Sequence, residues 1–123
     1  MKVFLSHPMH GIPESEVMEL RADMQKVLSV LYNEEIELID NYHHEDVPDN
    51  AGRLWHLGTS IRMMEQADAV FFVDGWDNAR GCHVEYEICR YYNLRVLNDE
   101  MVEYHKELKT GDGIDNPAIN MAD

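Results

Sequence analysis

One short apolar run constrains the fold more than any other feature of the chain. Residues Ala69–Val73 read AVFFV, without a polar residue among them. A strand that is apolar at every position is buried on both faces, which is typical of a central strand in a parallel sheet covered by helices on both sides. The run therefore predicts an α/β domain built around this strand.

The flanking residues alternate between strand-like and helix-like patterns. Three more segments are expected to form strands or strand-like runs: Lys2–Ser6, Glu35–Asp40 and Leu94–Leu97. Helices are expected over Glu14–Tyr32, Arg53–Ala67, Ala79–Tyr92 and Met101–Leu108. Because parallel strands need helical crossovers, this order predicts a doubly wound, flavodoxin- or Rossmann-like α/β fold. We expect a sheet of four to five parallel strands with helices on both faces.

The length of the chain is that of one domain. Its 123 residues are enough for a single hydrophobic core. Residues 1–108 are expected to form this core, and residues 109–123 have the composition of turns. We therefore predict one domain with a C-terminal tail.

The chain is strongly acidic. Its 10 Lys and Arg stand against 24 Asp and Glu, which gives a formal net charge of −14. Such a charge repels nucleic-acid backbones and anionic lipid headgroups, so neither a nucleic-acid polymer nor a membrane is expected as a partner. A small anionic ligand can still be held by backbone N–H groups at the start of a helix.

The cysteines and the N-terminal residues predict a cytoplasmic location. Cys82 and Cys89 lie seven residues apart on one predicted helix, about 10 Å apart at helical rise, which is too far for a disulfide. The apolar stretch near the N-terminus is too short for a secretion signal. The loop HHEDVPD (43–49) lacks the paired spacing of a zinc site, and no flavin-phosphate loop is present in the sequence, so we expect neither metal nor cofactor.

Two loops are placed to bind a ligand. In doubly wound folds, ligands bind beyond the carboxyl ends of the strands. The loops SHPMHG (6–11) and DGWDNARG (74–81) follow the first strand and the central strand, respectively. We expect Asp77 or Asn78 to cap the helix that follows the second loop.

Glu85 is the carboxylate on that helix most suited to chemistry. Cys82, Glu85, Cys89 and Tyr92 form one helical stripe, which places Glu85 at the border of the inward face. The start of a helix favours the ionised form of a carboxylate, and an ionised carboxylate in a cleft suits a nucleophile at a sugar carbon. The alternative is a surface ion pair between Glu85 and Arg80 or Arg62.

The segment from Met64 to Leu97 resembles the nucleoside 2-deoxyribosyltransferase-like superfamily. In particular it resembles a small branch of unassigned function that is common in phage and gut bacteria, and it is also similar to 2′-deoxynucleoside 5′-phosphate N-hydrolases. The opening loop contributes Pro8, Met9 and Gly11 to this resemblance. The rest of the pattern is Ala67, Asp68, Gly75, Trp76, Ala79, Arg80, Gly81, Cys82 and Glu85.

The resemblance implies an N-glycosidase or a 2-deoxyribosyltransferase that needs no cofactor. Glu85 would attack C1′ of a 2′-deoxyribosyl group, the base would leave, and water or a second base would resolve the covalent intermediate. Such proteins form homodimers or larger homo-oligomers in which a neighbour completes the site. Asn120 and Met121 in AINMAD resemble the element that enters the adjacent subunit.

Three positions depart from the family pattern. Ser60 stands where the characterised enzymes carry an aspartate, and His83 stands where glycine or alanine is common. Arg80 and backbone N–H groups replace a Ser-rich phosphate loop. The proton for the leaving group would then come from Asp74, from Asp77 or from a neighbouring subunit. These departures keep open a non-catalytic nucleotide-binding or sensing module, and an interaction domain without a small ligand.

The remaining candidates are expected to contact the substrate or to support the fold. Ser6 and His7 end the first strand, where the family places sugar or phosphate contacts. Ser60 could hold a ribose hydroxyl, and Gly81 leaves room for a ligand. Trp76 is expected either to stack on a base or to cover the edge of the sheet.

Overall fold

A computed structural model of the chain describes residues 1–43 and 46–101. Its strands are β1 (Lys2–Ser6), β2 (Glu37–Leu38) and β3 (Ala69–Phe72). Its helices are α1 (Glu14–Tyr32), α2 (Arg53–Met64) and α3 (Arg80–Tyr91), with a 3₁₀ turn, η1 (Trp76–Asn78), before α3 and a further helical segment from residue 97. This order confirms a mixed α/β fold.

The strands form one parallel sheet in the order β2-β1-β3. Val3 of β1 lies opposite Leu38 on one side and Ala69 on the other. Beyond β3, a single parallel bridge joins Val70 to Val96. The strand predicted over Leu94–Leu97 is reduced to this bridge, because a helix already begins at residue 97. The described residues therefore form three strands, fewer than the predicted four to five.

A side chain continues the hydrogen bonding at the outer edge of β3. The N–H of Phe72 donates to Oδ1 of Asn98 at 2.8 Å, and Nδ2 of Asn98 donates to the carbonyl oxygen of Phe72 at 2.8 Å. These are the two bonds that a neighbouring backbone would make. Asn98 therefore occupies the place of a further strand residue.

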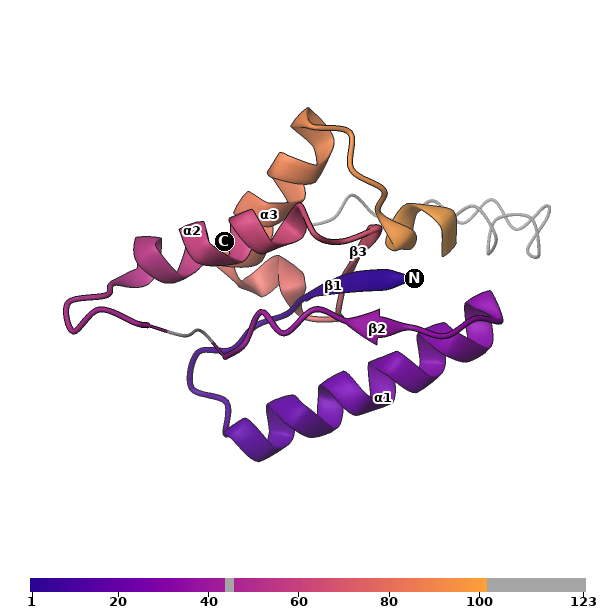
Figure 1. The fold of residues 1–123 in the computed structure, drawn as a ribbon, viewed down its shortest axis with the longest axis horizontal. Coiled ribbons are helices and arrows are strands. Elements are labelled where there is room, and N and C mark those ends of the chain that lie inside the picture. Colours follow the sequence, from indigo (N-terminus) through magenta and orange to yellow (C-terminus); the bar gives the residue numbers. More distant parts are fainter. Residues whose placement is uncertain (44–45, 102–123) are drawn as a thin grey trace.

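Helices cover both faces of the sheet, as predicted. Val3 and Leu5 pack with Leu28 of α1 on one face. Phe4 packs with Met64 and Cys89 on the other face, which α2 and α3 cover. Figure 1 shows α1 on one side of the strands and α2 and α3 on the opposite side. Because side chains alternate along a strand, each residue of β1 is assigned to one of these two layers.

The boundaries of α1 and β1 are as predicted, whereas other elements are shorter. The helix over Arg53–Ala67 ends at Met64, and the strand over Glu35–Asp40 is paired only at Glu37–Leu38. The predicted helix Met101–Leu108, apart from its first residue, and the tail 109–123 lie outside the described residues. No helix in the described part of the chain has the length and hydrophobicity needed to cross a bilayer.

The prediction that Asp77 or Asn78 caps α3 is wrong. Gly75 has a positive φ of 95°, which turns the chain directly into η1. Asp77 and Asn78 therefore lie within the 3₁₀ turn, and the N-cap position falls to Ala79, whose backbone is extended. The Ala79 side chain makes no capping hydrogen bond.

Candidate functional site

A buried polar contact joins the carboxyl end of the central strand to α3. Ser6 is the last residue of β1 and shares a face with Phe4, the face that α2 and α3 cover. Its hydroxyl donates a hydrogen bond of 2.7 Å to Oε1 of Glu85, in the second turn of α3. The two residues are only 1% and 6% exposed. The strand and the helix thus place Glu85 at the edge where doubly wound folds bind ligands.

The inward face of α3 buries Glu85 between two thiols. Cys82 and Cys89 are buried on the same stripe as Glu85, as the periodicity predicted. Tyr92 does not belong to this face, because α3 ends at Tyr91, and its side chain is 73% exposed. At Gly81, an added methyl group would lie 3.8 Å from Cδ1 of Leu57, an ordinary contact, so packing against α2 does not itself require glycine there.

Burial controls the charge of Glu85. Loss of solvation raises the pKa of Glu85 to about 7, and the hydrogen bond from Ser6 partly opposes this rise. Burial thus acts against the ionised form of the carboxylate, which the start of the helix was expected to favour. The alternative of an ion pair with Arg80 or Arg62 is also wrong, because the partner of Glu85 is the hydroxyl of Ser6.

A second buried network lies on the other face of β1, against α1. Arg21 is only 6% exposed. Its Nη1 donates to Oδ1 of Asn41 at 2.9 Å, and its Nη2 donates to the carbonyl oxygen of Ile39 at 2.6 Å. Asn41 in turn donates from Nδ2 to the carbonyl oxygen of Leu5 at 3.0 Å. The network ties the ends of β1 and β2 to α1.

His7 completes this network in a fixed, neutral form. Its Nδ1 lies 3.1 Å from the carbonyl oxygen of Pro8, and its Nε2 lies 3.1 Å from Nη1 of Arg21. Since a carbonyl oxygen accepts and a guanidinium donates, Nδ1 carries the proton and Nε2 accepts. Burial lowers the pKa of His7, and the charge of Arg21 acts in the same direction against the bond to Pro8. His7 is thus a buried residue, only 3% exposed.

Sequence reasoning missed Arg21 and Asn41. Arg21 lies four residues after Val17 and seven before Leu28, at an inward position of the apolar stripe of α1. A charged residue at such a position is the signal that could have identified it. Asn41 follows β2 at the same edge of the sheet as Ser6, which could have suggested a polar contact there.

Trp76 packs against the protein on the side of the sheet that α3 covers. Its ring stacks on Tyr86, with centroids 5.0 Å apart, and lies 5.2 Å from the ring of Phe72. His83 also contacts Trp76 and donates from Nε2 to the carbonyl oxygen of Asp77 at 2.6 Å. His83 is half-buried and holds the η1 turn against α3. Contact of Trp76 with a base stays a prediction.

The other predicted residues lie around the same edge of the sheet. Ser60 is buried on α2, whereas Asp74 is exposed two residues after the end of β3 and Asp77 is half-buried in η1. Pro8, Met9 and Gly11 lie in the loop between β1 and α1. Asp68 is structural, because its Oδ2 accepts a 2.7 Å bond from the N–H of Lys2. Asn120 and Met121 lie outside the described residues.

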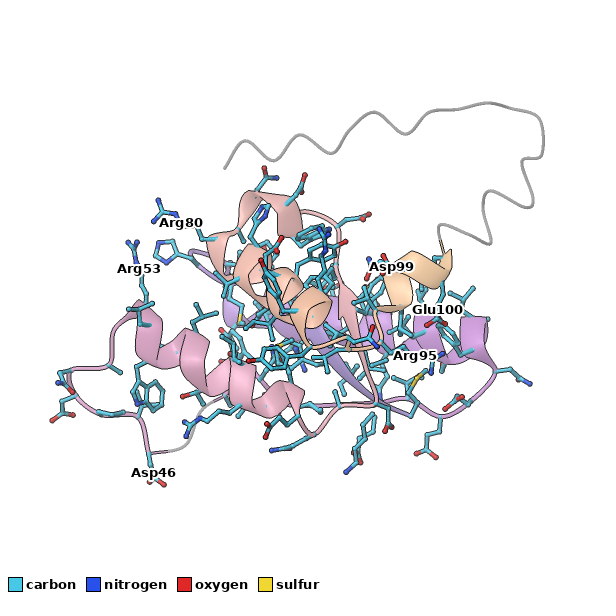
Figure 2. The ribbon with its side chains drawn as sticks, turned by 90° about the horizontal axis from the view of Figure 1, so that it is seen from above. Asp46, Arg53, Arg80, Arg95, Asp99 and Glu100 are labelled. Carbon is cyan, nitrogen blue, oxygen red and sulfur yellow. The ribbon has the colours of Figure 1, made fainter. Side chains whose placement is uncertain are left out.

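Two arginines mark the starts of the helices that cover this face. Arg53 and Arg80 are the first residues of α2 and α3, and both are exposed. Figure 2 shows both side chains at the same end of the molecule, away from Arg95 and Glu100. Arg95 is instead held by Glu100 through bonds of 2.7 and 3.0 Å. Arg53 and Arg80 therefore lie together at one end of the molecule, and Arg80 begins the helix that carries Glu85.

Two hollows of the surface lie away from the Ser6–Glu85 contact. One, of about 410 Å³, is lined by α1 and the start of β2, including Gln25 and Ile36. Another, of about 460 Å³, lies between α2 and α3 and includes Ile61 and Ile88. Neither is lined by Ser6 or Glu85. The candidate site is thus defined by its buried polar contact.

Within residues 1–43 and 46–101, no three His, Cys, Asp or Glu side chains are arranged to hold a metal ion.

Comparison with models of protein families shows the family to which the chain belongs. The model of a family described as a domain of unknown function, DUF4406, matches residues 1–98. The chain belongs to the DUF4406 family. The matched residues include the whole sheet, Ser6 and Glu85 of this DUF4406 domain. Searches of curated proteins and of solved structures found no match to the chain. The likeness to the nucleoside 2-deoxyribosyltransferase-like superfamily stays a prediction.

Proposed function

We propose that this DUF4406 domain cleaves the N-glycosidic bond of a nucleoside or nucleotide, either by hydrolysis or by transfer of the deoxyribosyl group. The observation that carries the proposal is the buried contact between Ser6 and Glu85 at the carboxyl end of the central strand. It presents one fixed carboxylate at the edge of the sheet where ligands bind in folds of this class.

In this mechanism Glu85 is the nucleophile. The hydroxyl of Ser6 holds Oε1, which leaves Oε2 to attack C1′ of the sugar. The carbon–nitrogen bond breaks, and a glycosyl ester forms on Glu85. Water or a second base then attacks C1′ and releases the carboxylate. Because only the ionised carboxylate attacks, and burial raises the pKa of Glu85 to about 7, activity rises with pH through neutrality.

The remaining candidates would hold the substrate. In the proposal, Arg80 and the N–H groups at the start of α3 bind a 5′-phosphate, and Ser60 holds a sugar hydroxyl. Trp76 and the loop from Ser6 to Gly11 would line the base and sugar. We further propose a cytoplasmic homodimer or larger homo-oligomer that uses no cofactor, in which Asn120 and Met121 contribute to a neighbouring site.

The alternative is a nucleotide-binding or sensing module of the same fold. One observation favours it: Glu85 is 6% exposed and already has a hydrogen-bond partner, as a purely structural buried glutamate would. This module would bind its ligand saturably and return it unchanged. Glu85 would then contribute to affinity alone.

Product analysis separates the two functions. The protein is incubated with deoxynucleosides, deoxynucleotides and their ribose counterparts, beside the variants Glu85→Gln and Glu87→Gln. Glu87 lies exposed on the same helix and is the matched control. Release of free base by wild type and Glu87→Gln, but not by Glu85→Gln, supports the glycosidase. A ligand-induced rise in melting temperature without release supports the binding module.

A further inference from the structure

We propose that Asn41 is a positioning residue for Glu85, acting through the peptide group that joins Leu5 to Ser6. Asn41 contacts α1, whereas Glu85 belongs to α3 on the opposite face of the sheet, so the two act on Ser6 from different sides. The inference deepens the proposed function, in which Glu85 is the acting group, and it rests on that function for its catalytic consequence only.

The side chain of Asn41 takes the place of a backbone donor beside β1. The N–H of Ile39 donates to the carbonyl oxygen of Val3 at 3.0 Å. Such bonds recur at every second residue of a parallel strand, so the next one would join the N–H of Asn41 to Leu5. That N–H instead bonds to the carbonyl oxygen of Ile39 at 3.0 Å, and Nδ2 of Asn41 donates to the carbonyl oxygen of Leu5 at 3.0 Å. The side chain thus continues the ladder where the backbone leaves it.

This bond fixes the peptide group that precedes Ser6. The carbonyl of Leu5 and the N–H of Ser6 belong to one planar unit, so a bond that holds the carbonyl also orients Ser6. On the other side of β1, the carbonyl oxygen of Ser6 accepts from the N–H of Val73 at 2.9 Å. The hydroxyl of Ser6 then donates to Oε1 of Glu85 at 2.7 Å. A movement of the Leu5 carbonyl is therefore passed on to the contact with Glu85.

Asn41 is itself held in one orientation. It is buried, and its Oδ1 accepts from Nη1 of Arg21 at 2.9 Å while its Nδ2 donates to Leu5. The two ends of the amide face a donor and an acceptor, which fixes which end is which. The same Nη1 lies 3.1 Å from Nε2 of His7. One buried guanidinium thus braces the residues on both sides of Ser6.

A positioning role has a consequence that a purely structural role lacks. Without Asn41, the Leu5–Ser6 peptide group is free to shift, and the bond from Ser6 to Glu85 weakens. That bond favours the ionised carboxylate and lowers the pKa of Glu85 against the effect of burial. Loss of Asn41 therefore raises the pKa of Glu85, as loss of the Ser6 hydroxyl does.

The first test is a double-mutant cycle on the pKa of Glu85, which is measured by NMR of the side-chain carboxyl carbon. The variants are Asn41→Ala, Ser6→Ala and the two combined. Gln25→Ala is the matched control, because Nε2 of Gln25 also donates to a backbone carbonyl, that of Ile36 at 2.7 Å, just before β2 begins. The thiols that share the buried face of Glu85 are the same in every variant.

We expect Asn41→Ala and Ser6→Ala each to raise the pKa of Glu85, and the double variant to show no rise beyond that of Ser6→Ala. Gln25→Ala should leave this pKa unchanged. If Asn41→Ala leaves the pKa unchanged, or if its effect is as large without the Ser6 hydroxyl as with it, Asn41 does not act through Ser6 and the inference is overturned.

A second substitution serves if the alanine variant does not fold. Asn41→Asp keeps the oxygen that Arg21 contacts and removes only the donor toward Leu5. The new charge acts on Glu85 with or without the hydroxyl of Ser6, so the same cycle with Ser6→Ala cancels it. A rise in the pKa of Glu85 that is larger in the presence of the hydroxyl supports the inference, and an equal rise contradicts it.

Turnover provides the catalytic readout. A displacement of about 1 Å at a reacting group can cost about 100-fold in rate, so we expect Asn41→Ala to lower kcat for base release by about 10- to 100-fold, with KM little changed. Gln25→Ala should keep the wild-type kcat. Equal kcat values for wild type and Asn41→Ala would overturn the inference and leave the glycosidase intact. If wild type releases no base, the glycosidase fails, and the pKa cycle still decides whether Asn41 positions Glu85.

Discussion

Replacing Glu85 by glutamine is expected to stabilise the fold, although it removes the proposed nucleophile. Burial raises the pKa of Glu85 from its ordinary 4.5 to about 7. Between these two values the folded protein holds a proton that the unfolded chain has lost. The free energy of unfolding therefore falls as pH rises through this window.

The size of the effect follows from the difference between the two pKa values. At about 1.4 kcal/mol per pKa unit, a difference of about 2.5 units corresponds to about 3 kcal/mol. Below about pH 4.5 the carboxyl is protonated in both states and contributes nothing. Above about pH 7 the carboxyl is ionised in both states, and the full loss of folding stability is present. Glutamine has the same shape, stays neutral, and still offers Ser6 an acceptor oxygen.

The assay is urea unfolding of wild type, Glu85→Gln and the control Glu87→Gln at several values between about pH 5 and pH 8. We expect Glu85→Gln to exceed wild type by about 1 kcal/mol near pH 5 and by about 3 kcal/mol near pH 8. Glu87 is exposed, so its variant should follow wild type throughout. A stability difference between wild type and Glu85→Gln that is constant with pH would refute the reasoning, because it would place the pKa of Glu85 at its ordinary value.

Four further substitutions test the supporting structure, each by urea unfolding at about pH 6. Arg21→Met should cost about 3 kcal/mol or more, because it leaves buried acceptors without a donor; a loss below about 1 kcal/mol would contradict the network. Asn98→Ala should cost about 2 kcal/mol through the two bonds to Phe72, and an unchanged midpoint would show that water replaces them. Gly75→Ala should lower the free energy of unfolding by about 1 kcal/mol, because the φ of Gly75 is positive. Gly58 is exposed within α2, so Gly58→Ala should raise the free energy of unfolding by about 1 kcal/mol. Equal effects of the two substitutions would refute the backbone argument.

The sequence was most informative where a segment is amphipathic or wholly apolar. The bounds of β1 and α1 follow directly from their patterns, and β3 is one residue shorter than the apolar run. The expected strand over Leu94–Leu97 failed because four apolar-rich residues cannot show where pairing stops. Beside β3, the expected strand is replaced by the bridge at Val96 and by the side chain of Asn98. Hydrogen bonding by a side chain leaves no periodic pattern in the sequence.

The candidate site was predicted in part. Periodicity indicated that Glu85 shares a face with Cys82 and Cys89, which is confirmed. The contact with Ser6 spans 79 positions in sequence, so only the folded chain could reveal it. The rise in the pKa of Glu85 could not be predicted for the same reason, since burial depends on what packs against the helix. Arg21 was overlooked because a single charged residue on an apolar stripe resembles the border of that stripe.

The amide of Asn98 also determines how this domain meets other chains. The free N–H and carbonyl groups of an unpaired sheet edge can pair with an extended segment of another chain, which leads to aggregation or strand exchange. The N–H and the carbonyl oxygen of Phe72 are already bonded to the Asn98 side chain, so a strand from another chain would first have to displace that side chain. The opposite edge is β2, with only two paired residues. One edge of the sheet is thus occupied by the Asn98 side chain and the other is short. Neither edge offers a long row of free backbone groups to which the strand of another chain could pair.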